Sequence, residues 1–370
     1  MSLSALRQNF QIVQQHVGRD VTICAVLKAD AYGHGAKECA RALEDDGASW
    51  FGVTGTDEGV VLREAGTRGR ILLMTGFWRG EAEEVIRQNL TSVVWEGSHV
   101  EELDRVARQM GASPQPVHLK VDTGMSRLGV DLAGLEPLCQ RLKAASGLSL
   151  EGVCTHFAAS EVIDGDESEV QASRFEQALK LVEANGFKPS FIHMANTSAV
   201  VGRRQSWKNM VRPGLALYGY TLPFQRDGRS ADVRPLDLKP ALSWKTRVLS
   251  IKEVAAGERL GYGGTFTTKV RSRIAVLPLG YADGLNRKLS SRGRVILRGH
   301  YAPMVGRISM DLTMVDVTQV PSAEVGDEVI LIGSTDGLSV TAKDHAEWAL
   351  TIPYEILCGI SKRVPRKYSS

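Results

Sequence analysis

Apolar and polar positions alternate with two different periods along the N-terminal part of the chain. Short runs rich in Val, Ile and Leu, typical of strands buried on both faces, are separated by segments with apolar residues at helical spacing. The strand-like runs are residues 22–27, 50–53, 71–74, 92–95, 117–121, 150–155, 190–194 and 210–218, and the helical segments are 4–16, 35–46, 57–65, 81–88, 98–109, 132–143, 167–184 and 196–201. Eight strand–helix units predict a (β/α)8 TIM barrel, whose active site lies at the carboxyl ends of the strands.

The same alternation also fits a doubly wound parallel sheet. No G-x-G-x-x-G sequence follows the first strand-like run, which argues against the dinucleotide-binding form of that fold.

The pattern changes at residues 221–239, a polar stretch with Pro223 and Pro235 that we interpret as a linker. Turn sequences then separate short strand-like runs at residues 242–254, 273–278, 294–297, 302–305, 312–317 and 328–332, with one helical segment at 340–349. We therefore predict an α/β protein with a barrel over residues 1–230 and a mostly-β domain over residues 231–370.

Composition excludes several classes of function. The formal net charge of +3 is small and no Lys/Arg block stands out, so we expect no nucleic-acid partner. No apolar run approaches the roughly 20 residues of a membrane helix, and the N-terminus lacks the pattern of a signal peptide, so we expect no membrane association. The five cysteines are widely spaced without a C-x-x-C pair, which indicates a cytoplasmic protein with reduced thiols and no metal site.

The first strand-like run ends on a lysine, Lys28. Burial at a strand end favours the neutral amine, which can form a Schiff base or act as a base. Tyr32 can place a hydroxyl near the same point, and Gly33 and Gly35 allow tight turning. On spacing alone, a surface lysine just past a strand explains Lys28 equally well.

Further polar residues follow other predicted strands. Lys120 ends the fifth strand and the loop from Asp122 to Gly129 follows it; His156, Asn196 with Thr197, and Arg212 come after the sixth, seventh and eighth. Each one alone is ordinary loop polarity. In a barrel, however, all strand ends meet at one mouth, and their shared position there favours a site.

Several of these segments resemble the alanine racemase family. Residues 25–36 resemble its pyridoxal-phosphate motif A-V-x-K-A-x-A-Y-G-H-G, and residues 120–129 resemble K-x-D-T-G-M-x-R-L-G. Further matches are residues 155–157 with T-H-F, 193–197 with H-x-A-N-S, 211–214 with V-R-x-G and 306–311 with G-R-x-C-M-D, together with the family segments at 261–265, 281–284, 352–355 and 363–366.

The resemblance implies pyridoxal 5′-phosphate as cofactor and a role for each matching residue. The implied cofactor-binding residues are Lys28, Tyr32, His156, Asn196, Thr197, Arg212, Gly214, Leu215 and Tyr354; the substrate-binding residues are Arg127 and Met310; and Lys120, Asp311 and Tyr281 are supporting. In the family, the lysine corresponding to Lys28 carries the cofactor, the arginine at Arg212 faces its pyridine nitrogen, and Lys120 is a candidate for carbamylation.

The implied reaction is interconversion of L- and D-alanine, which supplies D-alanine for peptidoglycan. Lys28 and Tyr262 are the implied catalytic bases, one on each face of the substrate. Tyr262 is expected from the partner subunit of a homodimer with shared active sites.

The chain departs from the family pattern at three places. Thr197 replaces a serine but keeps the hydroxyl, although Ser198 could take its role, and Ser309 replaces a cysteine. Family members usually begin with a short strand before the segment found here at residues 3–6, so a strand of the β domain is expected to be missing.

Two other functions stay open. A basic amino-acid decarboxylase shares the cofactor and domain order, but would not supply the Tyr-Gly-Gly segment at 262–264. A pyridoxal-phosphate carrier consists of a barrel alone, which the predicted second domain argues against. Within the racemases, serine or broader specificity is a third alternative.

Overall fold

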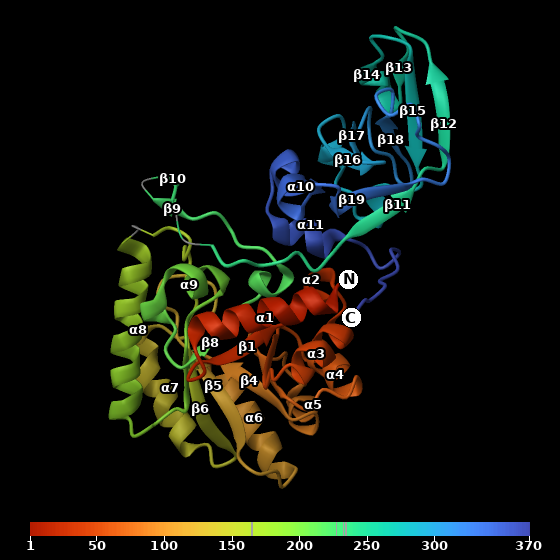
Figure 1. Ribbon diagram of the computed structural model, residues 1–370. Coiled ribbons are helices and arrows are strands. Elements are labelled where there is room, and N and C mark those ends of the chain that lie inside the picture. Colours follow the sequence, from red (N-terminus) through yellow and green to blue (C-terminus); the bar gives the residue numbers. More distant parts are fainter. Residues whose placement is uncertain (164–165, 227, 232, 234) are drawn as a thin grey trace. The chain divides into compact units, whose positions relative to one another are not determined.

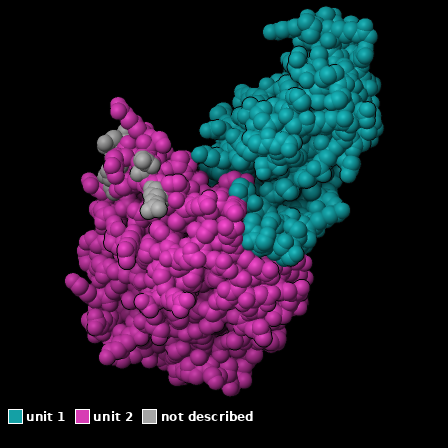
Figure 2. All heavy atoms as spheres, viewed as in Figure 1, with its two compact units in different colours: residues 1–5, 32–35, 240–370 teal, residues 6–31, 36–239 magenta. Residues whose placement is uncertain are grey.

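The computed structural model describes residues 1–163, 166–226, 228–231, 233 and 235–370. The chain forms two compact units, shown in Figure 2. The barrel unit comprises residues 6–31 and 36–239, and the β unit comprises residues 1–5, 32–35 and 240–370. The chain thus changes unit at residues 239–240, at the end of the expected linker 221–239, of which residues 227, 232 and 234 lie outside the described part. Nothing in the periodicity marked residues 1–5 and 32–35 as part of the second unit.

The barrel unit is a closed barrel of parallel strands in the order β1 to β8 (Figure 1), which confirms the predicted (β/α)8 barrel. Its strands are β1 (Thr22–Val26), β2 (Trp50–Val53), β3 (Arg70–Leu73), β4 (Leu90–Val94), β5 (Gln115–Lys120), β6 (Leu148–Cys154), β7 (Phe191–His193) and β8 (Met210–Val211). Its helices are α1 (Leu3–Val17), α3 (Ala36–Asp45), α4 (Thr56–Glu64), α5 (Ala82–Arg87), α6 (Gly97–Gln109), α7 (Leu132–Ala144), α8 (Asp166–Ala184) and α9 (Thr197–Gly202).

The strands are nearly continuous apolar runs because both faces are buried. One face packs under the helices, and the other contributes to a cluster inside the barrel that consists of Cys24, Trp50, Leu72, Val93, Cys154 and Met210. Helix α1 buries Leu6, Phe10 and Val13, which lie on one stripe at helical spacing. A packed interior leaves the mouth of the barrel as the place for a site.

The predicted strand over residues 210–218 was wrong beyond Val211. Pro213 has no N–H to donate to a ladder, and Gly214 has φ −116° and ψ −84°, away from strand geometry. Residues Leu215–Tyr218 instead form the 3-10 helix η2, and the hydroxyl of Tyr218 donates to the carbonyl of Val26 over 2.8 Å. The eighth strand therefore ends directly before Arg212.

Strand β1 ends in a left-handed turn, α2 (Lys28–Gly33), which periodicity did not predict. Ala29, Asp30, Ala31 and Tyr32 have φ between 52° and 54°. Left-handed backbone costs about 1–2 kcal/mol for each L-residue, so four in succession need support. Two supports are the Glu58 carboxylate, which accepts from the N–H of Ala29 over 2.6 Å, and the Asp30 carboxylate, which accepts from the N–H of Ala36 over 2.7 Å. The strain is concentrated directly after Lys28, as expected of a site that positions one side chain.

The β unit is mostly antiparallel sheet, which confirms the predicted β-rich second domain. One sheet has the order β11-β19-β16-β17, with β20 paired to β19, and a second has the order β12-β15-β18. The strands are β11 (Trp244–Arg247), β12 (Ser250–Val254), β13 (Arg259–Leu260), β14 (Phe266–Thr267), β15 (Ser272–Leu277), β16 (Arg294–Leu297), β17 (His300–Pro303), β18 (Thr313–Asp316), β19 (Glu328–Thr335) and β20 (Leu338–Val340). In the preceding stretch, β9 (Gln225–Arg226) and β10 (Arg229–Ser230) pair antiparallel.

Two helices accompany these sheets, where the pattern predicted one. Helix α10 (Ala342–Ala349) begins with a capping box between Thr341 and Asp344. Helix α11 (Pro353–Gly359) was missed because it is short and holds a proline. That proline is at the first helical position, where its missing N–H costs nothing. Among all the described helices, none is long and apolar enough to cross a membrane.

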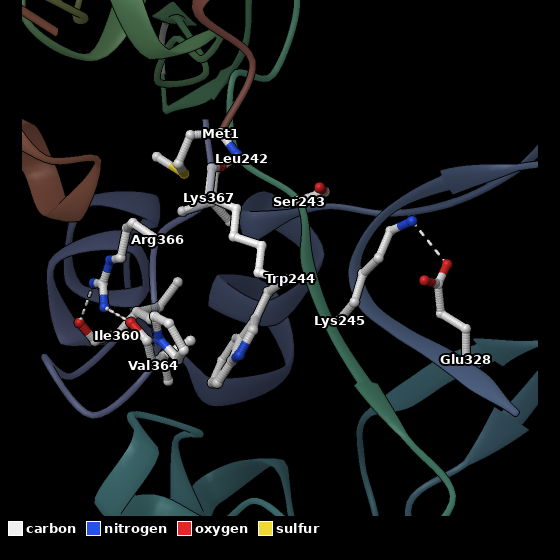
Figure 3. A pocket seen from close by; sticks show the side chains of 11 residues that line it. Met1, Leu242, Ser243, Trp244, Lys245, Glu328, Ile360, Val364, Arg366 and Lys367 are labelled. Carbon is white, nitrogen blue, oxygen red and sulfur yellow. Dashed lines mark hydrogen bonds and ion pairs between the residues drawn. The ribbon is translucent and has the colours of Figure 1, made fainter. Parts of the chain in front are cut away.

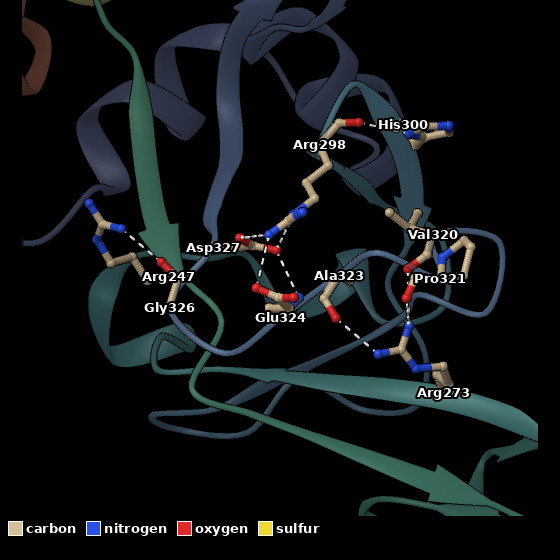
Figure 4. A network of polar contacts seen from close by, with 10 residues as sticks. All are labelled: Arg247, Arg273, Arg298, His300, Val320, Pro321, Ala323, Glu324, Gly326 and Asp327. Carbon is tan, nitrogen blue, oxygen red and sulfur yellow. Dashed lines mark hydrogen bonds and ion pairs between the residues drawn. The ribbon is translucent and has the colours of Figure 1, made fainter.

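Arginines tie the loops of the β unit to its strands (Figure 4). Arg298 forms a two-point ion pair with Asp327, at 2.6 and 2.7 Å, and also contacts Glu324. Arg273 donates to the carbonyls of Pro321 and Ala323 over 2.7 and 2.9 Å. The two-point contact between Arg298 and Asp327 orients the loop before β19. It adds little to the free energy of unfolding, because exposed ion pairs contribute about 0–1 kcal/mol.

His345 of α10 makes the stability of the β unit depend on pH. The side chain is buried against Trp348 and bonded to the carbonyl of Leu331 over 2.9 Å, and burial lowers its pKa from 6.5 to about 4. Between these values the unfolded chain binds the proton and the folded chain does not, so stability is lost as the pH falls from 6.5 to about 4. The lost free energy of unfolding is about 3 kcal/mol.

Denaturant titrations at several pH values, with wild-type protein and His345→Gln, would measure this loss. Glutamine keeps a donor for Leu331 and does not titrate, so the variant should lose less stability on acidification. Equal losses in both proteins would show that His345 is not responsible.

Candidate functional site

The predicted site residues of the barrel unit lie at one end of the barrel. Lys28 comes two residues after β1, Lys120 is the last residue of β5, and Arg212 directly follows β8. His156 lies two residues after β6, and Asn196 precedes α9, which follows β7. Since all eight strands are parallel in one closed barrel, these positions share the carboxyl-terminal mouth.

Arg212 is the buried centre of this mouth. Its guanidinium donates to the carbonyl of Thr155 over 2.8 Å, to Nδ1 of His193 over 2.6 Å and to Nδ1 of His156 over 3.2 Å. An arginine has only donors, so both Nδ1 atoms must be acceptors and both neutral rings carry their hydrogen on Nε2. The arginine therefore fixes the tautomer of both histidines.

His156 stays neutral in this position. Burial lowers its pKa to about 2, assisted by the positive charges of Arg212, Lys120, Arg127 and Lys28. The same four cations make the mouth strongly positive. Such a concentration of charge suits a ligand with anionic groups, such as a phosphate or a carboxylate.

A chain of polar side chains runs from Arg212 into the barrel. His193 on β7 and His118 on β5 are fully buried, and Nε2 of His193 lies 2.7 Å from Nδ1 of His118. Nε2 of His118 lies 3.6 Å from the Glu151 carboxylate on β6, which forms a two-point ion pair with Arg70 on β3. With the tautomer set by Arg212, His193 donates to Nδ1 of His118, and Nε2 of His118 then carries the hydrogen that faces Glu151 without forming a hydrogen bond to it. Glu151 pairs with Arg70, so the chain ends in an ion pair at its inner end.

His118, Glu151 and Arg70 were not predicted as site residues. A signal was present: His118 and Lys120 are two residues apart on β5, and residues at this spacing face the same side of a strand. Because Lys120 was predicted at the barrel mouth, His118, two residues earlier on the same strand, should also point into the barrel.

The Lys120 side chain forms no hydrogen bond or ion pair with another described residue. Burial lowers its pKa, and the charges of Arg212 and Arg127 lower it further, against Cys154 and Asp122. Asp122 is occupied by the loop after β5, where its carboxylate accepts from the N–H groups of Gly124 and Ser126 over 2.9 and 3.1 Å. Arg127 in this loop is exposed, and no hydrogen bond or ion pair holds it within the described part of the chain. The amine of a lysine is nucleophilic in its neutral form, which a lowered pKa favours.

The start of α9 offers backbone donors at the mouth. The Asn196 side chain caps this helix by accepting from the N–H of Ala199 over 3.1 Å, and also accepts from the Ser160 hydroxyl over 2.8 Å. The Thr197 hydroxyl accepts from the N–H of Gly214 over 3.0 Å, directly before Leu215. Thr197 therefore ties the loop after β8 to the start of α9. The N–H groups at both starts are the kind of donors that bind phosphate.

The remaining predicted residues belong to the β unit. The rings of Tyr32 and Tyr354 lie 5.6 Å apart at an angle of 43°. Tyr262 is 72% exposed on η3 (Tyr262–Gly264), where Gly261 and Gly263 have φ of 68° and 71°. Arg259 holds this turn by donating to the carbonyls of Gly263 and Gly264. The turn presents a phenol to the outside on a fixed backbone.

Around Tyr262 the β unit exposes further predicted residues. Tyr281 and Met310 are 43% and 53% exposed, and the backbone N–H of Tyr281 donates to the carbonyl of Ser309 over 3.1 Å. Asp311 forms an ion pair with Arg363 over 2.9 Å. A groove of about 510 Å³ beside Tyr262 is lined by Ser309, Leu312 and Met314 among others. The β unit thus exposes aromatic and apolar side chains at this groove.

The donors of the barrel mouth fit pyridoxal 5′-phosphate. The cofactor carries a phosphate, an aldehyde and a pyridine nitrogen. The N–H groups at the helix starts suit the phosphate, and the amine of Lys28 suits the aldehyde. The buried guanidinium of Arg212 suits the pyridine nitrogen.

Family models and relatives of known name match this chain along almost its whole length, and all of them belong to one family. Residues 1–222 match the family model described as alanine racemase, N-terminal domain, and residues 241–368 match alanine racemase, C-terminal domain. Alanine racemase 2 of Caldanaerobacter subterraneus subsp. tengcongensis is 41% identical over 372 residues, which cover 100% of this chain and 93% of that protein. The alanine racemase of Geobacter sulfurreducens is 40% identical, with 100% and 96% covered.

Two solved structures have the same fold. The alanine racemase from D-cycloserine producing Streptomyces lavendulae superposes with a TM-score of 0.93 at 33% identity, with 100% of this chain and 96% of that chain covered. The alanine racemase from Bartonella henselae, described with covalently bound pyridoxal phosphate, gives a TM-score of 0.87 at 30% identity, with 100% and 98% covered.

Proposed function

The chain belongs to the alanine racemase family, and from this premise we propose that it interconverts L- and D-alanine with pyridoxal 5′-phosphate bound to Lys28. The observation that carries the proposal is the set of four cations, Lys28, Lys120, Arg127 and Arg212, around the neutral His156. When bound, the cofactor acts as an electron sink that makes the Cα–H of the amino acid acidic.

The residues of the barrel mouth hold the two ligands in this proposal. Arg212 would face the pyridine nitrogen, and because arginine does not give up its proton, that nitrogen would stay unprotonated. Thr197, Gly214 and Leu215, with Asn196 behind them, would hold the phosphate, assisted by Tyr32 and Tyr354. Arg127, exposed and without an ion-pair partner among the described residues, would bind the substrate carboxylate, with Met310 beside it.

Inversion at Cα requires a base on each face, for which we propose Lys28 and Tyr262. A phenol with a pKa of about 10 is a weak base at neutral pH and needs a donor to stabilise its anion. His156 carries its hydrogen on Nε2, since Nδ1 accepts from Arg212, and can therefore donate to the phenolate oxygen. Tyr281 and Asp311 would support the surface that presents Tyr262.

We further propose that Lys120 is carbamylated. The lowered pKa leaves more of its amine neutral; the neutral nitrogen forms a bond to the carbon of carbon dioxide and releases one proton to solvent, which gives an anionic carbamate. The new anion would pair with Arg127 and hold it towards the substrate. Protein equilibrated with ¹³C-bicarbonate should show a carbamate carbonyl resonance that Lys120→Ala lacks, whereas Lys143→Ala, on the surface of α7, should keep it. An identical resonance in both variants would place the carbamate elsewhere.

We propose a homodimer in which Tyr262 acts at the active site of its partner. The β unit exposes four aromatic or apolar side chains, Tyr262, Tyr281, Met310 and Leu312. In a symmetric dimer these side chains would be buried on both subunits. Mixing Lys28→Ala with Tyr262→Ala protein should then regenerate activity. Each heterodimer has one site with both residues intact and one site with neither.

Activity of the mixture no higher than that of the single variants, with subunit exchange verified by native mass spectrometry, would place Tyr262 at the site of its own chain. A mixture of Tyr262→Ala with Tyr262→Phe protein is the control, because no site in it regains the phenol.

Chiral chromatography of L-alanine incubated with the purified protein and cofactor tests the proposed function. D-Alanine should form and the mixture should approach equal amounts, with slower conversion of serine, lysine and glutamate. Release of carbon dioxide from lysine, without D-alanine, would favour a decarboxylase. We also propose cytoplasmic supply of D-alanine for peptidoglycan, for which rescue of a D-alanine auxotroph is the test.

A further inference from the structure

Lys28 lies between a fixed strand end and a turn of unusual hand. The N–H of Leu27, directly before it, donates to the carbonyl of Gly52 over 2.8 Å, which ties the end of β1 to β2. Ala29, directly after it, begins the left-handed turn with a φ of 52°. Because the hand of the turn sets the path of the backbone at Lys28, it also sets the direction in which this side chain leaves the backbone.

One carboxylate, that of Glu58, joins the ends of two neighbouring strands. Its Oε1 accepts from the N–H of Ala29 over 2.6 Å. Its Oε2 accepts from the N–H of Thr54 over 2.8 Å and from the hydroxyl of the same residue over 2.9 Å. Thr54 directly follows β2, so Glu58 connects the first residue after Lys28 with the end of the next strand. Hydrogen bonds to a charged acceptor are stronger than those between neutral groups.

Helix capping explains only part of these contacts. Glu58 is the third residue of α4, and its Oε2 also accepts from the N–H of Gly55, the N-cap, over 3.4 Å, as in a capping box. The contact of Oε1 with Ala29 adds nothing to that cap, because Ala29 lies on a different segment, 29 residues earlier in the chain. This second contact therefore acts on the turn after Lys28.

The turn consists of backbone that its residues rarely adopt. All four residues from 29 to 32 have positive φ, and none of them is a glycine. Ala29 and Asp30 are exposed, so packing of their side chains contributes little at this end of the turn. Glu58 supplies the charged acceptor there. A change of Ala29 towards negative φ would remove the strain and redirect Lys28.

We propose that Glu58 is a positioning residue for Lys28. By holding the N–H of Ala29, its carboxylate keeps the left-handed turn, and the turn keeps the Lys28 amine directed at the aldehyde of pyridoxal 5′-phosphate. In the attachment, the neutral amine nitrogen forms a double bond to the aldehyde carbon, and the aldehyde oxygen leaves as water with the two hydrogens of that nitrogen. Glu58 exchanges no bond in this step. The inference rests on the proposed attachment of the cofactor to Lys28.

Glu58→Gln isolates the contact with Ala29. Three donors, on Thr54 and Gly55, meet Oε2, so the single carbonyl oxygen of glutamine should keep the cap and leave its NH2 group facing Ala29. The full chain, freed of cofactor and mixed with pyridoxal 5′-phosphate, should then develop the absorption of covalently held cofactor about tenfold or more slowly than wild type.

A second substitution tests whether the effect passes through the turn. Ala29→Gly in the Glu58→Gln background should restore part of the attachment rate, because glycine adopts positive φ without steric cost. The exposed methyl group of Ala29 is lost without opening a cavity. Equal rates for wild type and Glu58→Gln, or no recovery on adding Ala29→Gly, would overturn the proposal.

Two other glutamates are controls for the loss of a carboxylate. Glu44 accepts from the N–H groups of Arg68 and Gly69, and Glu328 is paired with Lys245 over 2.7 Å (Figure 3). Glu44→Gln and Glu328→Gln should attach the cofactor at the wild-type rate. Slower attachment in either control would overturn the assignment, because loss of a carboxylate elsewhere would then be sufficient.

The position of the attached cofactor separates this inference from the proposed function. Borohydride reduction followed by peptide mass analysis identifies the lysine that carries it. A cofactor found on another lysine would contradict the proposed function, and the role of Glu58 would fall with it. Attachment to Lys28 at an unchanged rate in Glu58→Gln would overturn the role of Glu58 alone.

Discussion

Lys28→Ala should lose the visible absorption of covalently held pyridoxal phosphate and nearly all racemisation. The amine of Lys28 is the proposed attachment point of the cofactor and one of the two proposed bases, so its removal abolishes two functions at once. Loss of a general base alone lowers rates by about 10²–10⁴-fold, and loss of attachment adds to this. Absorption spectra after dialysis and chiral chromatography measure the two effects separately.

A matched control keeps this result specific. Lys37→Ala removes an exposed lysine at the start of α3 and should leave both the spectrum and the activity unchanged. If Lys28→Ala retained the absorption after exhaustive dialysis, another lysine would hold the cofactor. Lys120 at the same mouth would be the first to examine.

Most of the barrel could be predicted from periodicity. The strands at residues 50–53 and 294–297 match the structure at both ends, because apolar, β-branched runs between turns have few alternatives. The failures occur where backbone geometry is unusual. Residues 210–218 look like one apolar strand, but Pro213 and Gly214 divide the run and place Arg212 at its break.

The left-handed turn after Lys28 could not be predicted from pattern. Alanine and tyrosine seldom adopt positive φ, and here the support comes from Glu58, which is remote in sequence. Local propensity holds no information about such a contact. The unpredicted geometry thus lies directly beside the residue that family resemblance made most important.

The candidate site also contains some residues that could be predicted from the sequence and others that could not. Position at strand ends selected Lys28, Lys120, His156 and Arg212, because a closed parallel barrel brings all strand ends to one mouth. Roles for Tyr262 and Asp311 came only from family resemblance, since a tyrosine on an exposed turn and a surface ion pair carry no chemical signal of their own. The inner chain of His193, His118, Glu151 and Arg70 could not be predicted, because its members come from four separate strands.

The central claim is that Lys28 and Tyr262 act on opposite faces of Cα. Removing one base should damage proton abstraction from one enantiomer much more than from the other. Net racemisation cannot reveal this, because the equilibrium constant between enantiomers is one and both directions must slow equally. Exchange of the Cα hydrogen in heavy water, followed by NMR with each enantiomer separately, can reveal it.

For Tyr262→Phe, we predict that exchange from L-alanine slows by about 10²–10⁴-fold while exchange from D-alanine, served by Lys28, slows far less. Phenylalanine keeps the ring and removes only the hydroxyl. Tyr301→Phe, on β17, is the control and should leave both rates unchanged. Equal slowing of exchange from both enantiomers by Tyr262→Phe would contradict the two-base account and favour one base that reaches both faces.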